Sequence, residues 1–396
     1  MNWIEEKNYL RGAVNKLEEL FDPVRVASFD LDDTLIYRPM KDSEEWKLLD
    51  PTADTILANL VDRRYIIVIF TNQSGMSKKD FDIAGWRKNM DQLYLKLVSK
   101  MKNPYYFAIY VAKTHDLYRK PNLGMWDKMK SDLKDRFGMA KLRISTKSFF
   151  VGDAGGRINA SIFKKKIHPK SNKGDFSDVD RKFALNIGIK YLTPEDIFME
   201  DAPEMEYQLK GFDPVKFLKN VSVTQNNYLF QPRKKEMIIL VGFPGSGKTE
   251  FFKKYIAPYE YVHINQDTCK TKVKCTSLTK SSLEEQKSVV IDNTNSDLLT
   301  RASYIKLAVD YGYKHIRAII LDSNIDLAKH LNNVRHIYSG GEIPKINDIV
   351  YNIYKKNYRE PSKSERFDKI ENVEFEFDIA KLDDPLWRKI FTRWSE

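Results

Sequence analysis

The sequence predicts an α/β protein with two domains, each built on a parallel β-sheet. The chain has 396 residues, the length of two or three ordinary domains. In both halves, short runs rich in β-branched residues alternate with amphipathic stretches, a pattern typical of βαβ units. The predicted strands are Val24–Phe29, Ile66–Phe70, Phe107–Ala112 and Ser148–Val151 in the first half, and Met237–Val241, Tyr261–Ile264, Ser288–Ile291 and Ile316–Leu321 in the second.

The domain boundary is predicted near residue 225. Residues 201–236 contain Pro, Asn and Gln without a clear period, which indicates a connector. The sequence therefore predicts an N-terminal lead over residues 1–23, in which Trp3–Leu20 are helical, a first domain over residues 24–225 and a second over residues 226–396.

The composition is that of a globular protein, with 42% apolar and 31% charged residues. No run of about 18 apolar residues occurs, so we expect no transmembrane helix and no membrane partner. The first residues include acids and lack the apolar core of a signal peptide, so we do not expect secretion. The two cysteines, Cys269 and Cys275, are too few for a disulfide framework, which favours a reducing compartment.

The net charge of +11 favours a polyanionic partner. Such lysine runs are usually solvated surface, but here they lie beside motifs for phosphate chemistry, so a solvated face and a nucleic-acid contact both remain open. The two clusters are Lys164, Lys165, Lys166, Lys170 and Lys173, and Lys253, Lys254, Lys270, Lys272, Lys274 and Lys280.

The segment VGFPGSGKT in the second half predicts a nucleotide-binding loop. It places Gly242, Gly247, Lys248 and Thr249 in the spacing G-x-x-x-x-G-K-T between a predicted strand and a helix, with Gly245 inside the loop. Glycines let backbone N–H groups surround phosphates, the lysine reaches the β- and γ-phosphates, and the threonine hydroxyl holds Mg²⁺. We therefore expect ATP or GTP to bind there.

Side chains at later strand ends could complete a kinase site. Asp267 follows a predicted strand and could accept the proton of an attacking hydroxyl, or it could cap a helix. Asp292 could be an Mg²⁺ ligand, or Asn293 and Asn295 could simply order that turn. Arg335 lies on a basic predicted helix before a Gly-Gly turn, where a mobile arginine could stabilise a transferring phosphate.

The segment FDLDDT in the first half places three carboxylates within four positions after a predicted strand. A polar turn is one interpretation. The other is a D-x-D-x-T phosphotransfer motif, in which Asp30 attacks phosphorus and Asp32, two residues further on the same side of an extended chain, handles protons.

Three later residues supply the remaining parts of such a site. Thr71 follows a second predicted strand and could bind a phosphoryl oxygen, and Lys120 could neutralise an aspartyl phosphate. Asp153 follows a further strand and could share Mg²⁺ with Asp30. Each is more often structural by itself, but their order and their places at strand ends favour a common site.

The order Asp30, Thr71, Lys120, Asp153 resembles the haloacid-dehalogenase phosphatase superfamily, and the intervals leave no room for a large cap domain. Together with the P-loop half, the chain resembles the polynucleotide kinase 3′-phosphatase family. The resemblance rests on FDLDDTLI, VIFTNQSG, THDLYRKPNLGMWD, FVGDAGGR, DFSDVDRKFALNIGI and YLTPEDIF in the first half, and on VGFPGSGKT, YVHINQDT, IDNTN and EIPKINDIVYNIYKKNY in the second.

The resemblance implies a capless haloacid-dehalogenase-like Rossmannoid sheet followed by a P-loop kinase sheet. It implies a bifunctional DNA repair enzyme, a nuclear monomer, that removes 3′-phosphates and uses ATP to phosphorylate 5′-hydroxyls. Its cofactors would be Mg²⁺ and ATP, and its partner DNA with 3′-phosphate or 5′-hydroxyl ends. RNA end repair and a non-catalytic scaffold for DNA ends are the alternatives.

Residue by residue, the family pattern assigns catalytic roles to Asp30, Asp32, Thr71, Lys120, Asp267 and Arg335; nucleotide binding to Gly242, Gly245, Gly247, Lys248 and Thr249; and metal binding to Asp30, Asp32, Asp153 and Thr249. Arg157 and Arg181 could touch phosphate or hold a loop. Asp33 and Gln266 depart from the family, which often has Gly and Arg there. No forkhead-associated module is expected, so binding to phosphopeptide scaffolds is not predicted.

Overall fold

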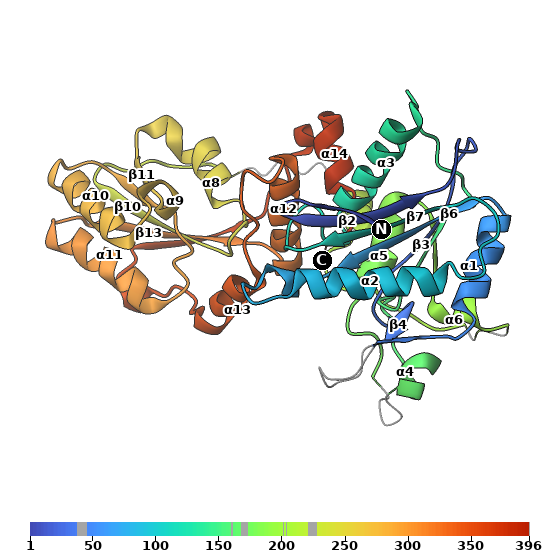
Figure 1. Cartoon of the computed structure of the whole chain (residues 1–396). Coiled ribbons are helices and arrows are strands. Elements are labelled where there is room, and N and C mark those ends of the chain that lie inside the picture. Colours follow the sequence, from blue (N-terminus) through green and yellow to red (C-terminus); the bar gives the residue numbers. More distant parts are fainter. Residues whose placement is uncertain are drawn as a thin grey trace. The chain divides into compact units, whose positions relative to one another are not determined.

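The computed structural model describes residues 1–37, 46–159, 161–167, 173–200, 202, 204–220 and 228–395. These residues form two compact units, one of residues Met1–Gly211 with the last residues from Arg393, and one of residues Phe212–Thr392 (Figure 1). The boundary that the sequence predicts near residue 225 lies outside the described residues. In the structure, the first unit ends at Gly211 and the second begins at Phe212. The predicted fold class is confirmed, because each unit is an α/β structure with a largely parallel sheet.

The first unit is built on a seven-stranded sheet with the order β1-β2-β7-β6-β3-β8-β9. The five strands from β7 to β9 are parallel, and each expected strand of this half is present. Their bounds are β3 Arg25–Phe29, β6 Tyr65–Asn72, β7 Tyr106–Ala112, β8 Phe149–Val151 and β9 Lys190–Leu192. A separate two-stranded sheet pairs β4 (Ile36–Tyr37) with β5 (Lys47–Leu48).

The predicted helix over Trp3–Leu20 is wrong, because this segment forms two strands, β1 (Asn2–Glu5) and β2 (Tyr9–Asn15). β2 pairs with the edge of β7 in antiparallel register, from Tyr9 opposite Ala112 to Asn15 opposite Tyr106. Glycine lowers the stability of a helix. Here the Trp3 ring packs so closely on Gly12 that a Cβ at this position would lie 2.7 Å from a ring carbon. Pairing with the open edge of β7 therefore outweighs the local helical pattern.

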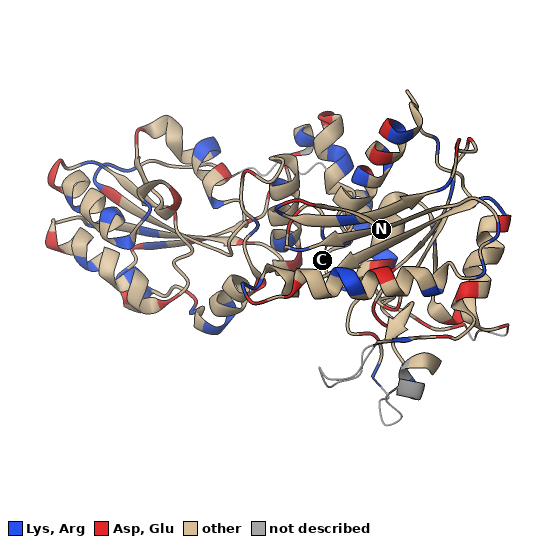
Figure 2. Ribbon diagram, in the orientation of Figure 1, with Lys and Arg blue, Asp and Glu red and all other residues tan. Residues whose placement is uncertain are grey.

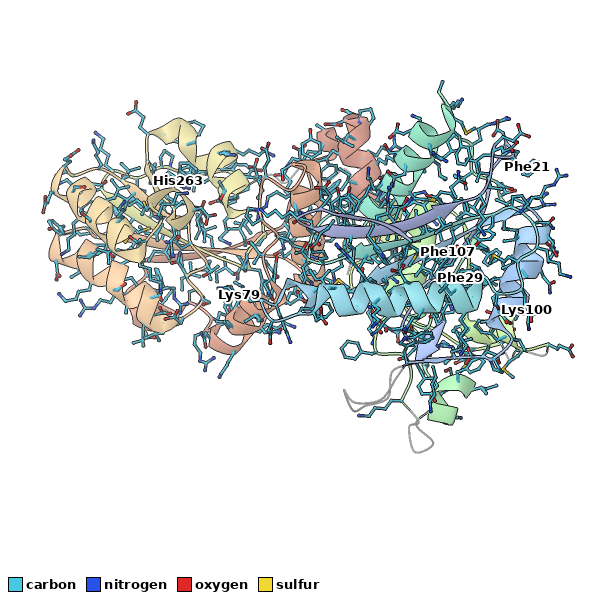
Figure 3. The ribbon with its side chains drawn as sticks, viewed as in Figure 1. Phe21, Phe29, Lys79, Lys100, Phe107 and His263 are labelled. Atoms are coloured by element: carbon cyan, nitrogen blue, oxygen red, sulfur yellow. The ribbon has the colours of Figure 1, made fainter. Side chains whose placement is uncertain are left out.

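Helices cover both faces of the first sheet. Side chains of α1 (Ala53–Asp62) and α2 (Ile83–Leu97) share one core cluster with Ala27 and Phe29, whereas those of α3 (Gly124–Phe137) and α5 (Val179–Ile187) share another with Val26. Alternate residues of β3 thus enter opposite cores, as the period of a strand requires. Figure 3 labels Phe29 and Phe107, which belong to the first cluster. The shorter helices are α4 (Ile162–Ile167) and α6 (Pro194–Phe198).

The second unit is built on a five-stranded parallel sheet with the order β11-β12-β10-β13-β14. Its strands are β10 Glu236–Val241, β11 Val262–Ile264, β12 Val289–Ile291, β13 His315–Asp322 and β14 Lys369–Glu374. The four strands that the sequence predicts here are all present, and β14 is added. The helices are α7 Pro214–Asn220, α8 Lys248–Phe251, α9 Gln266–Cys269, α10 Lys272–Glu284, α11 Leu298–Asp310, α12 Ile325–Tyr338, α13 Asp348–Asn357 and α14 Pro385–Phe391.

Charged residues of both signs are spread along the helices of both units (Figure 2). In the lysine cluster of the second unit, Lys253 pairs with Glu250 and Lys254 with Glu376, as on an ordinary solvated surface. Residues 168–172 of the other lysine cluster lie outside the described residues. None of the described helices combines the length and the apolar character needed to cross a membrane.

Candidate active sites

The first candidate site lies at the carboxyl ends of three neighbouring parallel strands. Asp30 directly follows β3, Thr71 is the penultimate residue of β6, and Asp153 lies two residues beyond β8. The Asp30 backbone N–H donates to the Val151 carbonyl at 2.8 Å, which holds two of these strand ends together. The parallel sheet therefore brings together three predicted residues that are far apart in the sequence.

Lys120 joins this group from the loop after β7. Its Nζ lies 2.7 Å from an Asp30 oxygen and 2.6 Å from an Asp180 oxygen, and the side chain is 1% exposed. Burial opposes its charge, but the carboxylates of Asp180 and Asp30 outweigh that effect and raise the pKa of Lys120. Lys120 thus places an ammonium group against Asp30.

The loop that holds Lys120 is fixed by Asn72, the last residue of β6. The Asn72 side chain accepts a hydrogen bond from the Lys120 N–H at 2.9 Å and donates one to the Lys120 carbonyl at 3.2 Å. This two-way pairing attaches the backbone of Lys120 directly to the strand end beside Thr71.

Three carboxylates form a candidate metal site. Asp30, Asp153 and Asp180 can each offer one oxygen, with all three oxygens within 4.8 Å of one another. Burial, followed by repulsion from Asp180 and Asp30, raises the pKa of Asp153 well above its usual range, and burial is the main cause that raises the pKa of Asp180 to about 7. A hard divalent cation prefers oxygen ligands and would relieve this repulsion, so the donor set fits Mg²⁺.

Asp32, which was also predicted as a metal ligand, is not part of this group of three carboxylates. Its Oδ2 accepts a hydrogen bond from the side-chain amide of Gln73, and the same amide nitrogen donates to the Thr71 hydroxyl at 3.0 Å. Gln73 thus ties Asp32 to Thr71 across the site. This arrangement suits a proton-handling group beside a phosphate-binding hydroxyl.

The departure at Asp33 has a backbone explanation. Asp33 has a φ of 53°, in the left-handed region that glycine adopts most easily and that Asp tolerates. Its N–H donates to the Ile36 carbonyl at 2.6 Å, which closes the turn after the two preceding acids. Glycine is therefore favoured at this position by the backbone conformation of the turn, which Asp33 also adopts.

Arg157 is structural. Its guanidinium group contacts Asp175 at 2.9 Å and Glu195 at 2.7 Å, donates to the Asp153 carbonyl at 2.8 Å, and is almost fully buried. Arg181 donates to the Gly155 carbonyl at 2.7 Å. The two arginines thus hold the loop that carries Asp153.

The second candidate site begins with the loop between β10 and α8. Gly245 and Gly247 have φ values of 77° and 85°, which an L side chain rarely adopts. A Cβ on Gly242 would lie 2.6 Å from the Ser246 hydroxyl oxygen, and one on Gly245 would lie 2.9 Å from the Ala328 carbonyl of α12. The glycines are thus required by the tight curvature of the loop and by its contact with α12.

Lys248 is folded into this loop. Its Nζ donates to the carbonyl oxygens of Gly242 at 3.0 Å and Phe243 at 2.7 Å. Burial lowers the pKa of Lys248 to about 8, although Asp292 and Asp267 oppose this change. An anionic phosphate in the loop would place a negative charge beside the buried ammonium and favour its charged form, which is the chemistry expected of a nucleotide site.

Asp292 follows β12 and faces Thr249. The Thr249 hydroxyl donates to Asp292 Oδ2 at 2.7 Å, the pairing typical of the two Mg²⁺-linked side chains of P-loop kinases. Asn295 orders the turn in parallel, because its amide donates to the Leu240 carbonyl at 2.7 Å. The position of Asp292 thus suits an Mg²⁺ ligand, and Asn295 orders the same turn, so the two interpretations of this segment are compatible.

Asp267 and Arg335 lie at exposed positions of this unit. Asp267 is in the first turn of α9, whose N-cap is Asn265, so the capping role considered for Asp267 belongs to Asn265. Gln266 begins α9, and its N–H donates to Asn293 at 2.9 Å. Arg335 lies in the last turn of α12, the helix against which Gly245 packs.

Several site residues were missed by sequence reasoning. Asp180 lies in the first turn of α5, where acids are common for reasons of helix stability, so no pattern distinguished it. Gln73, Asn265 and His263 contact site carboxylates, but polar residues after strands are common in turns.

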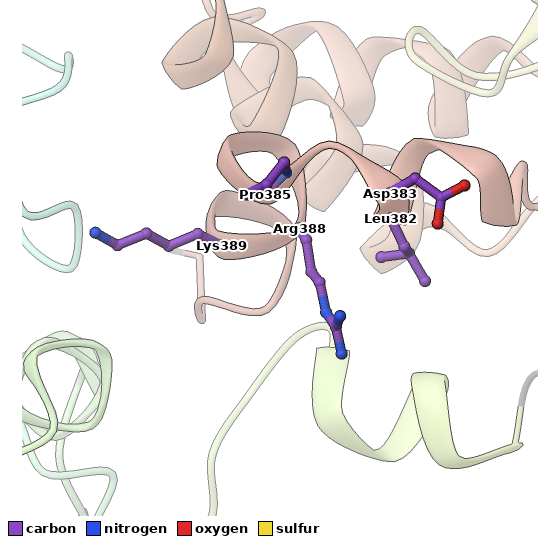
Figure 4. Close-up of a pocket in the computed structure, with 5 residues that line it drawn as sticks. All are labelled: Leu382, Asp383, Pro385, Arg388 and Lys389. Atoms are coloured by element: carbon purple, nitrogen blue, oxygen red, sulfur yellow. The ribbon is translucent and has the colours of Figure 1, made fainter.

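A surface pocket of about 470 Å³ on the second unit contains none of these site residues. It is lined by Leu382, Asp383, Pro385, Arg388 and Lys389 (Figure 4).

Comparisons with known proteins agree with the two-part architecture. A family model described as "Polynucleotide kinase 3 phosphatase" matches residues 25–198, and a model of an AAA domain matches residues 237–345. The two matches fall on the first and the second unit respectively.

Relatives extend this similarity over the whole chain. A protein of Acanthamoeba polyphaga mimivirus, assigned provisionally as a bifunctional polynucleotide phosphatase/kinase, is 55% identical over 100% of this chain and 95% of its own length. The bifunctional polynucleotide phosphatase/kinase of Schizosaccharomyces pombe is 30% identical over 91% of this chain and 82% of its own. A polynucleotide 3′-phosphatase of Arabidopsis thaliana is 32% identical over 46% of this chain and 25% of its own. With two site geometries and full-length relatives of this kind, the chain belongs to the family of bifunctional polynucleotide phosphatase/kinases.

Proposed function

We propose that this protein repairs DNA ends, removing 3′-phosphates in its first unit and using ATP to phosphorylate 5′-hydroxyls in its second. The observation that carries the proposal is the contact of 2.7 Å between Lys120 and Asp30 at a strand end, beside the half-buried carboxylate of Asp153 and the buried carboxylate of Asp180. A carboxylate held by a buried cation suits the formation of a phosphorylated aspartate. The P-loop, with Thr249 bonded to Asp292, supports the second activity.

In the phosphatase reaction, an Asp30 oxygen attacks the phosphorus of the 3′-phosphate. An Asp–phosphorus bond forms, the bond from phosphorus to the 3′-oxygen breaks, and Asp32 gives its proton to the departing oxygen. Asp32 then accepts a proton from water, whose oxygen attacks phosphorus and releases inorganic phosphate and Asp30. Thr71 donates to a phosphoryl oxygen, and Lys120 balances its charge.

Asp30, Asp153 and Asp180 are the residues that would hold Mg²⁺ here, and Thr249 and Asp292 would do so in the kinase. When bound, the ion supplies positive charge beside the transferring phosphoryl oxygens. Lys120 and Lys248 contribute the protein's own positive charge at the two sites.

In the kinase reaction, Asp267 accepts the proton of the 5′-hydroxyl while the hydroxyl oxygen attacks the γ-phosphorus of ATP. The bond between the γ-phosphorus and the bridging oxygen breaks, and ADP leaves. Lys248 and the N–H groups of the loop bind the phosphates, and Arg335, at the end of α12, balances charge on the transferring group. The exposed position of Asp267 suits access by a polymer end.

The test uses a labelled DNA nick with a 3′-phosphate and a 5′-hydroxyl, incubated with Mg²⁺ in the presence or absence of ATP. We expect loss of the 3′-phosphate in both conditions and 5′-phosphorylation only with ATP. A matched RNA nick distinguishes the two polymers. A protein that binds the duplex but changes neither end would contradict the proposal and favour a scaffold.

A further inference from the structure

We propose that Asn265 is a positioning residue of the kinase site, which fixes the carboxylate of Asp292 and the helix that carries Asp267 relative to each other. The inference rests on the proposed kinase function and deepens it. Its basis is one buried amide side chain that contacts both functional segments.

The contacts of Asn265 run in two directions. Asn265 lies between β11 and α9 and is only 9% exposed. Its Oδ1 accepts a hydrogen bond from the Asp267 N–H at 2.7 Å. Its Nδ2 donates to the Asp292 carbonyl at 2.9 Å and to Asp292 Oδ2 at 3.1 Å. An amide offers a donor and an acceptor at one end, so a single side chain can make both connections.

Asp292 Oδ2 is a crowded oxygen. Besides Asn265, it receives the Thr249 hydroxyl at 2.7 Å and lies 2.9 Å from His263 Nε2. His263, labelled in Figure 3, belongs to β11 and stacks on Phe252 with ring centroids 4.0 Å apart. Thr249 and His263 fix the Asp292 side chain, but of these groups Asn265 is the one that also holds the α9 backbone.

Helix capping alone does not explain the Asn265 contacts. Asn324 caps α12 in the same way, because its Oδ1 accepts from the Asp326 N–H at 2.7 Å within the same Asn-x-Asp spacing. Asn324 is exposed, whereas Asn265 is buried and its amide nitrogen faces a carboxylate. Serine would cap either helix equally well. The additional donor toward Asp292 is therefore what asparagine provides at residue 265.

Two substitutions separate capping from positioning. Asn265→Ser retains a capping oxygen but is too short to reach Asp292. Asn265→Asp retains the cap and places a carboxylate oxygen against Asp292 in place of a donor, so the two charges repel. Asn324→Ser is the matched control, because it makes the same change at a cap that contacts no proposed site residue.

The measurements are kcat and KM for ATP and for a 5′-hydroxyl DNA, the affinity for ADP as Mg²⁺ is titrated, and the melting temperature. We expect Asn265→Ser to lower kcat about 10- to 100-fold, as is usual for residues that orient a metal-linked carboxylate, with a larger loss for Asn265→Asp. Both should need more Mg²⁺ to bind ADP. Asn324→Ser should stay within about twofold of the unchanged protein, and phosphatase rates should not change.

Normal kcat and normal Mg²⁺ dependence in Asn265→Ser would overturn the inference. An equal kinase loss in Asn324→Ser would also overturn it, because capping would then be the cause. If Asn265→Ser melts too low to assay, Asn265→Asp, which is closer in size to asparagine and also keeps a capping oxygen, decides through the same two readouts. Absence of kinase activity in the unchanged protein would instead refute the proposed function itself, so the two failures are distinguishable.

Discussion

The ammonium group of Lys120 lies 2.6 Å from the carboxylate of Asp180, and both side chains are almost completely buried. Removal of one member of such a pair leaves a charge in a poorly solvated place, which is strongly unfavourable. Asp30 and Asp153 place further carboxylates close to this pair, so the protonation of each carboxylate depends on the charge of the others. The pair of Lys120 and Asp180 therefore also contributes to the stability of the first unit.

Asp180→Asn is expected to abolish most phosphatase activity and to lower the free energy of unfolding of the first unit by about 2 kcal/mol. The cause is that Lys120 keeps one carboxylate partner where it had two. Urea unfolding and release of phosphate from a 3′-phosphorylated DNA measure the two effects. Asp135→Asn, on an exposed position of α3, is the control. Wild-type turnover in Asp180→Asn would show that the pair has no part in the site.

The two activities are expected to be independent. Asp30→Asn should remove phosphatase turnover and leave the kinase unchanged, because Lys120 still pairs with Asp180 and the unit stays folded. Lys248→Met should do the opposite. Both ends of one labelled nick, followed in the same reaction, report the two rates. A folded Lys248→Met protein without phosphatase activity would contradict the two-site description.

Thr249→Val should lower kinase activity about 100-fold and raise the Mg²⁺ concentration needed for half-maximal rate, because the hydroxyl that bonds to Asp292 is lost. Thr249→Ser keeps that hydroxyl and should restore most of the rate. Initial rates over a series of Mg²⁺ concentrations provide the measurement. The prediction is wrong if valine and serine behave alike.

A pH-dependent contribution to stability is expected from Asp132. Burial alone would raise the pKa of this carboxyl, but hydrogen bonds from Arg11, Lys128 and Tyr110 outweigh burial and lower it below its ordinary value near 3.8. The stabilisation is therefore complete above that value and is lost as pH falls through the lower folded pKa. Asp132→Asn should cost about 2 kcal/mol at pH 7 and progressively less in acid.

Urea unfolding of the two proteins between pH 2 and pH 7 tests this prediction. Lys130→Gln, which breaks the exposed pair with Asp127 on the same helix, is a control that should change stability little at any pH. A difference between Asp132→Asn and the unchanged protein that stayed constant down to pH 2 would contradict the assignment.

Much of the fold followed from local patterns. Each of the eight predicted strands is present, because runs of β-branched residues between amphipathic stretches report both the strand and its buried environment. The segment Trp3–Leu20 was misjudged, since its pairing with β7 depends on a partner about 100 residues away, and no local pattern reports an open sheet edge. Strand β14 was missed for a different reason, because its apolar residues alternate with charged ones and so resemble a surface segment.

The sequence by itself determined the chemistry at strand ends, since a motif such as FDLDDT or GFPGSGKT has its geometry set by adjacent residues and by the direction of the preceding strand. Tertiary structure alone decided which distant groups complete these motifs. Asp180 meets Lys120 across 60 positions, and Asn265 meets Asp292 across 27. Such contacts arise from the stacking of parallel strands and the burial of a charge beside its partner, and both depend on how the sheet and its helices pack.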